Sequence, residues 1–243
     1  MGEHDKTIVL FTRDEGLVRA VVKGARKPMS KLSSVTQPYT RAFFQLYRGR
    51  SMDRVTQVSL RTTHPGMAAE YGKMVYAGFL CELVSGVVPE REKNEGLFDF
   101  FSRVLRNLEE RDDPWPVATW GALGVLARAG FAPSFSECAA CGAPVSGDAL
   151  FSAEDGGLLC LKCGSKPADR EGSISVSAGT VRLLDMLAQS SAKDADCPSL
   201  NARGRVREEA LSVLLRYIQG VLGRRPKSAS LVESIEVEKR LKE

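Results

Sequence analysis

Histidine is almost missing from this 243-residue chain, which contains only His4 and His64. Neither stands at metal-ligand spacing, and the HExxH, GxSxG and GxxxxGKS/T motifs are missing as well, so metalloprotease, serine hydrolase and nucleotide hydrolase activities lack support. Paired carboxylates occur at 109–110 and 112–113, but they flank a helix end followed by proline, where solvated charge is expected. The missing motifs favour a binding protein over an enzyme.

Long apolar runs are missing too. The N-terminus has no apolar stretch of the signal-peptide kind, and the longest hydrophobic segment, 74–88, is interrupted by Glu82 and too short to span a bilayer. We therefore expect a protein of the reducing cytoplasm that has no membrane partner. With 43% hydrophobic and 26% charged residues, the chain can bury the core of one large or two modest domains.

Four of the six cysteines form two CxxC pairs, which are separated by eighteen residues and each followed by glycine. The spacing lets both thiolates of a pair face one point, and four thiolates leave no ligand position for water, so the sequence predicts one structural Zn²⁺. The predicted ligands are Cys138, Cys141, Cys160 and Cys163. Two disulfides are an alternative that a reducing compartment disfavours, and a redox pair does not account for two symmetric copies. We expect Cys81 and Cys197 to be packing residues.

Basic residues are concentrated at the start of the chain, although the net charge is only +4. Residues 1–75 contain thirteen lysines and arginines against six aspartates and glutamates, whereas the remainder has a small acidic excess. Two basic clusters on turn-like stretches are typical of a surface that follows a phosphate backbone, and a merely solvated surface is the alternative. The residues predicted to bind DNA are Lys23, Arg26, Lys27, Lys31, Arg48, Arg50 and Arg54.

Four strands are predicted in the first part of the chain, at 6–12, 17–23, 41–48 and 55–60. They are rich in β-branched and aromatic residues and joined by turns without a crossover helix, which predicts a small antiparallel β-barrel. Alternation puts Phe43 and Tyr47 on one face of the third strand. Phe44 and Leu46 take the other face, so only one of these sets can stack on bases. We therefore assign DNA contact first to the basic residues.

From residue 67 onward the hydrophobic period becomes 3.6, which predicts a mostly helical chain. The predicted helices lie at 67–87, 97–110, 115–129, 177–189 and 203–222. A loop is expected at 190–202 and a charged tail of uncertain order at 231–243. The predicted fold class is thus α+β, with an N-terminal nucleic-acid-binding domain at 1–64 and a helical domain at 65–243 that contains a zinc-binding insertion at 131–170.

Several segments follow a known pattern, from 2–12 and the Val-Lys-Gly-Ala-Arg-Lys stretch at 22–27 to the cysteine-rich segments and the Leu-Gly-Arg-Arg-Pro-Lys-Ser stretch at 222–228. Together with the strands at 43–49 and 55–60, they resemble the RecO family of bacterial recombination mediators. The resemblance covers about the whole chain. Its most specific parts are the basic loop and the C-terminal stretch.

The resemblance implies an N-terminal OB-fold and a zinc-containing helical domain in a protein of DNA repair and homologous recombination that is not an enzyme. Such a protein binds single- and double-stranded DNA, anneals complementary strands and promotes recombinase loading on coated single strands in a RecFOR-type pathway at the nucleoid. The implied partners are RecR and the acidic C-terminal tail of single-stranded DNA-binding protein. We expect the helical domain to dock these partners, with Arg216, Arg224 and Arg225 receiving the acidic tail.

One departure concerns the start of the chain. In the family a strand precedes the segment matched by 2–12, whereas this chain begins at Met1. We therefore expect residues 6–61 to supply four of the five barrel strands and 6–12 to be an exposed edge. An upstream extension of roughly ten to fifteen residues is expected to raise stability and reduce self-association.

A zinc-containing protein-interaction scaffold without direct DNA binding is the alternative reading of the same sequence. In that case the basic surface would bind an acidic protein. A zinc-ribbon nuclease or transcription factor is a weaker alternative, and the missing acidic metal site argues against a nuclease. Salt-dependent binding to nucleic acid would separate the DNA-binding protein from the scaffold.

Overall fold

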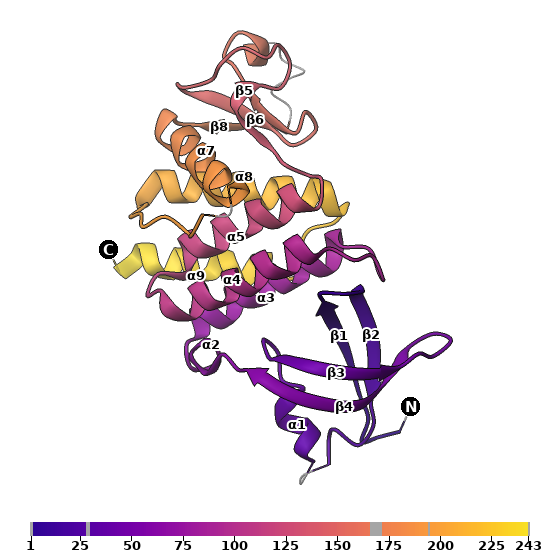
Figure 1. The fold of residues 1–243 in the computed structure, drawn as a ribbon. Helices are drawn as coiled ribbons and strands as arrows, with labels where there is room; N and C mark the ends of the chain where they lie inside the picture. The colour runs from indigo at the N-terminus through magenta and orange to yellow at the C-terminus, as the bar shows by residue number, and fades with distance from the viewer. Residues whose placement is uncertain (1, 28–29, 166–171, 194, 243) are drawn as a thin grey trace.

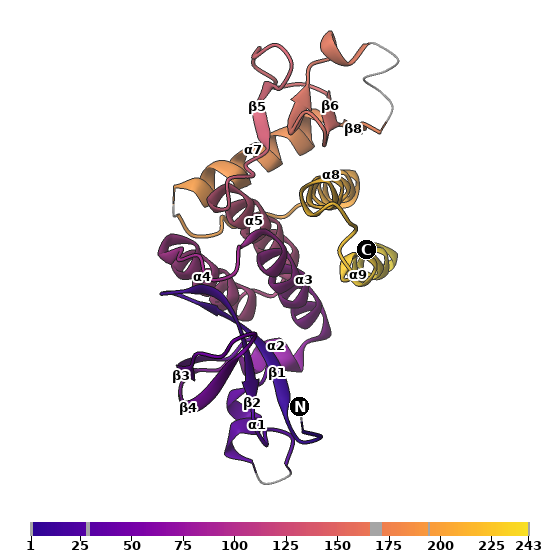
Figure 2. The same cartoon turned by 90° about the vertical axis from the view of Figure 1, so that its right-hand side faces the viewer.

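A computed structural model describes residues 2–27, 30–165, 172–193 and 195–242, and it places a β-sheet at each end of the molecule with helices between them (Figures 1 and 2). The N-terminal sheet and the second, smaller sheet therefore lie on opposite sides of the helical layer. The side chain of Lys31 and residues 166–170 of the predicted insertion lie outside the described part of the chain.

The N-terminal sheet contains four strands, as the sequence predicts. Its elements are β1 (Lys6–Thr12), β2 (Gly16–Val22), the short helix α1 (Lys31–Val35), β3 (Arg41–Tyr47) and β4 (Asp53–Thr62). The strand order is β1-β2-β4-β3, so β1 and β3 are the two edges and the sheet does not close into a barrel. The predicted exposed edge at β1 is confirmed, since β1 pairs with β2 alone among the described strands.

The expectation of a purely antiparallel sheet was wrong. Strands β2 and β4 pair in parallel through Ala20 with Asp53 and Val21 with Arg54. The reason is the connection between β2 and β3, which carries α1 and is not a hairpin. Since β3 and β4 form an antiparallel hairpin, β4 then runs in the same direction as β2.

Side-chain alternation determines which face of the sheet is its core. Ala20, Val22, Ala25 and Val55 are buried, and Ile8, Leu10, Leu32, Phe44, Leu46 and Val58 pack against them. Phe43 and Tyr47 are 61% and 70% exposed on the opposite face. The predicted division of the β3 side chains is thus confirmed, and of the four residues compared only Phe43 and Tyr47 are accessible to a ligand.

The helical layer holds the main core. Its helices are α2 (Pro65–Ala69), α3 (Tyr71–Val87), α4 (Glu95–Glu110), α5 (Pro114–Arg128), α7 (Ala178–Ala192), α8 (Gly204–Leu222) and α9 (Ala229–Lys242). Helix α5 lies at the centre, and its Trp115 and Trp120 have no exposed surface. Because these rings are the largest fully buried side chains, each removes more apolar area from water than any other single residue of the core.

One predicted helix is divided in the structure, and the segment whose order was left open is a helix. The single helix at 67–87 is broken at Glu70, whose backbone is extended with φ −119° and ψ 114°. The carboxylate of Glu109 accepts a hydrogen bond from the amide of Gly66 at 3.0 Å and so fixes α2 separately from α3. The segment predicted to be a charged tail is helix α9, which buries Val232 and Ile235 against the rest of the molecule.

The insertion is a second sheet and not only a loop. Strands β5 (Ser134–Cys138), β6 (Ala149–Ser152), β7 (Gly157–Leu159) and β8 (Ile174–Val176) are ordered β5-β7-β6-β8. These strands are three to five residues long, too short for a clear alternating pattern in the sequence.

The N-terminal sheet is joined to the helical layer by polar contacts around Arg91. The Arg91 guanidinium lies 2.7 Å from both Asp53 Oδ1 and Glu15 Oε2, and its amide donates to the carbonyl of Leu17. A Cβ at Gly16 would lie 2.0 Å from the carbonyl oxygen of Glu92, so the tight approach requires glycine there.

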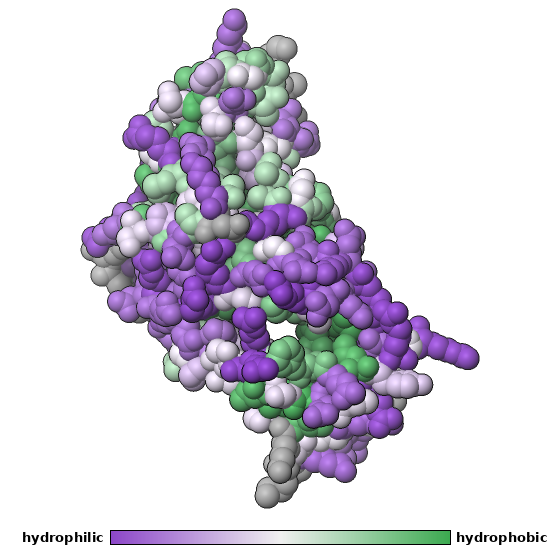
Figure 3. Space-filling view, in the orientation of Figure 1, coloured by the Kyte–Doolittle hydropathy of each residue, from purple (hydrophilic) through white to green (hydrophobic). Residues whose placement is uncertain are grey.

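The hydropathy of the surface differs between the helical layer and the area beside the N-terminal sheet. On the face seen in Figure 3, hydrophilic residues cover most of the helical layer, whereas apolar residues gather beside a hollow between the helices and the N-terminal sheet. Among the described residues, no helix combines the length and apolar character needed to cross a membrane.

Candidate nucleic-acid interface and metal centre

Four cysteine thiols meet at the second sheet. The Sγ atoms of Cys138, Cys141, Cys160 and Cys163 all lie within 4.8 Å of one another. Tetrahedral Zn–S bonds of about 2.3 Å would place the sulfurs about 3.8 Å apart. The Cys141 and Cys160 sulfurs are 4.0 Å apart, compared with about 2.05 Å in a disulfide. The four thiols therefore form a group that could hold one tetrahedral metal ion.

Two paired strands bring the halves of this group together. Cys138 ends β5 and lies opposite Leu158 of β7, and Cys160 directly follows β7. Burial acts to raise the pKa of the Cys138 thiol, but backbone N–H donors, first that of Cys160, outweigh it and lower this pKa to about 6. The thiolate, which is the metal-binding form, is thus favoured at neutral pH.

The other two cysteines lie away from this group. Cys197 is buried, and burial raises the pKa of its thiol to about 11. Cys81 packs against the helical core, and burial raises its thiol pKa to about 12. Both are therefore neutral packing residues at physiological pH, as the sequence predicts.

The first basic cluster forms an exposed turn after β2, which we call the basic loop (residues 23–27). Asp5 Oδ1 accepts a hydrogen bond from the Gly24 amide at 3.1 Å, and Gly24 has a φ of +65°. These features fix the backbone while Lys23, Arg26 and Lys27 extend into solvent. None of the three forms an ion pair with a carboxylate in the described part of the chain. Their charges are therefore available to an anionic partner.

The structure separates the residues of the second predicted cluster. Arg48 Nη2 lies 3.3 Å from Glu15 Oε2, so this arginine belongs to the contacts around Arg91. Arg50 is exposed in the turn between β3 and β4, and Arg54 lies on β4 opposite Tyr47. Only Arg50 and Arg54 of this cluster are free of acidic partners among the described residues.

The exposed side chains of β3 and β4 form a continuous surface, which we call the outer face. It consists of Arg41, Phe43, Gln45, Tyr47, Arg54, Gln57, Ser59 and Arg61. Phe43 lies opposite Ser59, and the Arg61 guanidinium carbon is 4.3 Å from the centre of the Phe43 ring. Sequence reasoning missed Arg41 and Arg61 because they lie outside the basic clusters. Their alternation with Phe43 and Tyr47 was the available signal.

The two strands of the outer face contribute no exposed carboxylate to it. Asp53 is the single acidic residue of β3 and β4, and it is 2% exposed. A hydrogen bond from Arg91 holds the pKa of Asp53 below its usual value, so the carboxylate remains ionised and paired with that arginine. The arginines of the outer face therefore give it a net positive charge.

Comparison with known proteins identifies the family. The model described as "Recombination protein O C terminal" matches residues 68–230, and "Recombination protein O N terminal" matches residues 1–64. The chain belongs to the recombination protein O family. Members of this family act in DNA repair as mediators and not as catalytic enzymes.

Curated relatives in the recombination protein O family cover much of the chain. A protein of Symbiobacterium thermophilum named "DNA repair protein RecO" is 32% identical over 235 residues, which is 95% of this chain and 91% of the relative. Proteins of the same name from Desulforudis audaxviator and Pelotomaculum thermopropionicum are 38% and 34% identical, over 66% and 76% of this chain and 64% and 71% of their own lengths.

The C-terminal stretch that resembles the recombination protein O family anchors helix α9. Glu82 of α3 accepts hydrogen bonds from the amides of Lys227 and Ser228 and from Arg224 Nη1, at 2.9, 3.0 and 2.9 Å. Arg225 pairs with Glu233. Burial acts to raise the pKa of Glu82, but these donors outweigh it and lower the pKa to about 2. The stretch therefore has a structural role in this member of the family.

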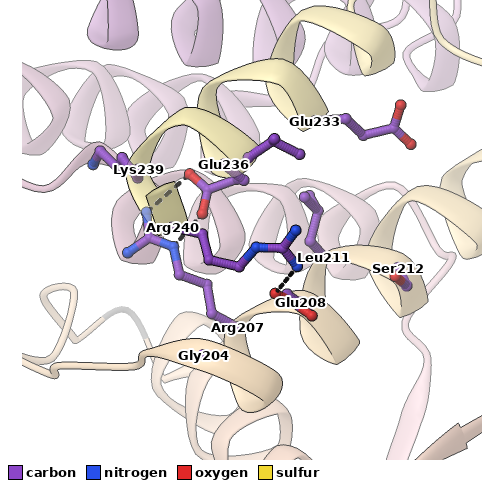
Figure 4. Close-up of a pocket in the computed structure, with 10 residues that line it drawn as sticks. Gly204, Arg207, Glu208, Leu211, Ser212, Glu233, Glu236, Lys239 and Arg240 are labelled. Atoms are coloured by element: carbon purple, nitrogen blue, oxygen red, sulfur yellow. Dashed lines mark hydrogen bonds and ion pairs between the residues drawn. The ribbon is translucent and has the colours of Figure 1, made fainter. Parts of the chain in front are cut away.

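A cavity of about 150 Å³ lies between α8 and α9 (Figure 4). Glu208 and Arg240 form an ion pair at 2.7 Å, and Arg207 pairs with Glu236 and with Asp113. The two other charged residues that line the cavity, Glu233 and Lys239, pair with Arg225 and Asp113. Every charged residue of the lining therefore has a partner of opposite charge in the described chain. The cavity thus offers no unpaired charge to an acidic peptide.

Proposed function

We propose that this protein is a DNA repair and homologous-recombination mediator that binds single- and double-stranded DNA through its N-terminal sheet. The observation that carries the proposal is the basic loop, where three cationic side chains are exposed and form no ion pair with any acidic residue that the structure describes. Arg50 and Arg54 add further charge. Lysines and arginines that neutralise phosphates release counterions, and this release drives binding without reading sequence.

We propose that the N-terminal sheet, at 1–64, is an open form of the OB-fold, joined to a helical domain at 65–243. The matches of two family models to 1–64 and 68–230 support this boundary. An OB-fold presents one strand face and its loops to nucleic acid, and here that face and the basic loop share a sheet. Lys31 is also proposed to contact DNA, and this proposal rests only on its position in the sequence close to the basic loop.

Strand annealing and recombinase loading on coated single strands are the proposed activities, with RecR and the acidic C-terminal tail of single-stranded DNA-binding protein as proposed partners. Membership of the family supports them. We propose the helical domain as their docking region. Because Arg224 and Arg225 are already paired, an acidic tail that used them would have to displace Glu82 and Glu233. The proposed location is the nucleoid.

We propose Zn²⁺ as the ion held by Cys138, Cys141, Cys160 and Cys163. Four thiolates suit zinc, and a four-sulfur shell leaves no open position for substrate or water. The ion would therefore hold β5 and β7 together and take no part in a reaction.

Binding to fluorescent DNA across a salt series tests the proposed function. Removing the charges of Arg26 and Lys27 together should weaken binding to single and double strands alike. The slope of log affinity against log salt should become shallower by about 1 to 2 units, because up to two phosphate contacts are lost.

The matched control removes the same charge from α7 and its C-cap, where Arg182 and Lys193 are exposed. The Arg182→Gln/Lys193→Gln variant should bind like the wild type. An unchanged affinity and slope in the Arg26/Lys27 variant would reject the basic loop as the site. A wild type that binds no DNA at low salt would instead favour the protein-interaction scaffold.

A further inference from the structure

We propose that the outer face is a base-stacking platform that makes the DNA site prefer unpaired bases. The inference rests on the proposed DNA binding and assigns to Phe43, Tyr47 and Arg61 a role distinct from that of the basic loop. The structure supplies two large aromatic rings that are 61% and 70% exposed on the same face of one strand, with Gln45 between them.

Exposure distinguishes these rings from the other aromatic rings of the sheet, Phe11 and Phe44, which are partly buried. Phe44 and Leu46, their neighbours on β3, are partly buried against the core of the sheet. Phe43 and Tyr47 instead face solvent, at positions of β3 where polar side chains would be expected. An exposed aromatic pair on a rigid strand is a suitable stacking surface, since every base has a π face and the rings lose little freedom on binding.

The positive charge around the two rings indicates which kind of ligand the outer face can bind. Arg61 lies over the Phe43 ring, Arg54 is opposite Tyr47, and the single acidic residue of the two strands is buried and paired. An apolar protein partner would leave these arginines unpaired, whereas a polynucleotide supplies phosphates to the guanidinium groups and bases to the rings. Charge complementarity therefore argues against an apolar protein, and the exposed rings beside the arginines favour a ligand that has both phosphates and bases.

Strand geometry adds the preference for unpaired bases. Phe43 and Tyr47 are four residues apart on β3, which corresponds to about 13 Å. Each ring would therefore take a separate base. The bases of a duplex are stacked on one another and cannot present their faces to protein rings, so only a splayed single strand satisfies both positions. The basic loop would bind both single-stranded and duplex DNA, whereas the outer face would bind single strands.

The test measures single-strand and duplex affinities of the full chain side by side, with an oligothymidine and a duplex of equal length. The Phe43→Leu/Tyr47→Leu variant should bind the single strand at least about tenfold more weakly, because base–aromatic stacking contributes roughly that much per base. Its duplex affinity and salt slope should stay within about twofold of the wild type. The Tyr71→Leu variant, which removes an exposed ring from α3, is the control and should change neither.

Two further variants address stacking directly. Arg61→Lys keeps the charge but removes the planar group, so it should lower single-strand affinity at an unchanged salt slope. Tyr47→Trp should keep single-strand affinity, and its exposed indole should be quenched by the single strand but not by the duplex. The native tryptophans Trp115 and Trp120 are buried and provide a constant background.

The outcomes separate this inference from the function on which it rests. A double variant that retains wild-type single-strand affinity would overturn the stacking platform and leave DNA binding intact. Equal losses for single strand and duplex would also overturn it, because the rings would then act on contacts common to both. A wild type that binds neither DNA would reject the proposed function itself, and the inference with it.

Discussion

Single carboxylates act as structural anchors in this protein. Glu82 accepts hydrogen bonds from the segment that precedes α9, and Glu209 accepts them from Ser177 and Thr180 at the start of α7. In both cases burial acts to raise the pKa, but hydrogen-bond donors outweigh it and lower the pKa to about 2. Negative charge at a helix start is also favoured by the helix dipole.

The low pKa of Glu82 predicts a loss of stability in acid. A carboxyl whose pKa is lower in the folded state stabilises the fold above its unfolded pKa. This contribution disappears as the pH falls from about 4.5 to about 2. The Glu82→Gln variant should lose about 1–3 kcal/mol of unfolding free energy at pH 7, because buried donors lose a charged acceptor.

Urea unfolding between pH 7 and pH 2 measures this effect. The curve of stability against pH should be flatter below pH 4.5 for Glu82→Gln than for the wild type. Glu110→Gln, which alters an exposed carboxylate at the end of α4, is the control. Parallel pH curves for the wild type and Glu82→Gln would show that Glu82 is not the titrating anchor.

At the scale of elements, short strands depend on their crosslinks. The second sheet has strands of three to five residues, and its β5–β7 pair joins at two register positions only. Strands of this length bury little area by themselves, so a bound metal would supply much of their stability.

The Cys138→Ser variant should therefore lose the metal and loosen residues 130–164, while the N-terminal sheet keeps its structure. Elemental analysis should find about one zinc per wild-type chain, and amide exchange should rise within the second sheet of the variant. Cys197→Ser is the control, since Cys197 lies outside the metal group. Wild-type protein without metal and with four readily alkylated thiols would contradict the proposed zinc site.

The whole molecule is joined by contacts between distant parts of the chain. Arg91 connects the turn at Glu15 and the buried Asp53 of the N-terminal sheet to the helical layer. Tyr39, held at a φ of +63°, donates a hydrogen bond to the carbonyl of Met74 and forms a second connection. The relative placement of the outer face and the helices depends on these contacts.

The Arg91→Met variant should weaken the connection between the N-terminal sheet and the helical layer. It leaves the Asp53 carboxylate buried without its charged partner, and we expect a loss of about 1–3 kcal/mol together with a broader unfolding transition. Thermal unfolding followed by calorimetry checks this. Arg13→Met, which removes an exposed ion pair with Glu95 and Asp99 at the same boundary, should change stability by less than about 1 kcal/mol. A single sharp transition of wild-type stability for Arg91→Met would contradict the coupling.

The sequence by itself predicted the features that depend on local spacing. The CxxC pairs place their thiols together, alternation on β3 separates Phe43 and Tyr47 from Phe44 and Leu46, and the 3.6-residue period predicts the long helices. These patterns act over a few residues, where backbone geometry leaves few options. The four N-terminal strands were predictable for the same reason, whereas the expectation of an edge at β1 came from the resemblance to the family.

Only the tertiary structure decided the features that depend on distant partners. It made the predicted tail a helix, because Glu82 anchors a segment more than 140 residues away. It also paired Arg48 with Glu15 and left Arg61 on the Phe43 ring, although the sequence pattern favoured Arg48 as the free cation. Whether a charge is free or neutralised is set by groups that folding brings within a few ångströms, and no local pattern records that distance.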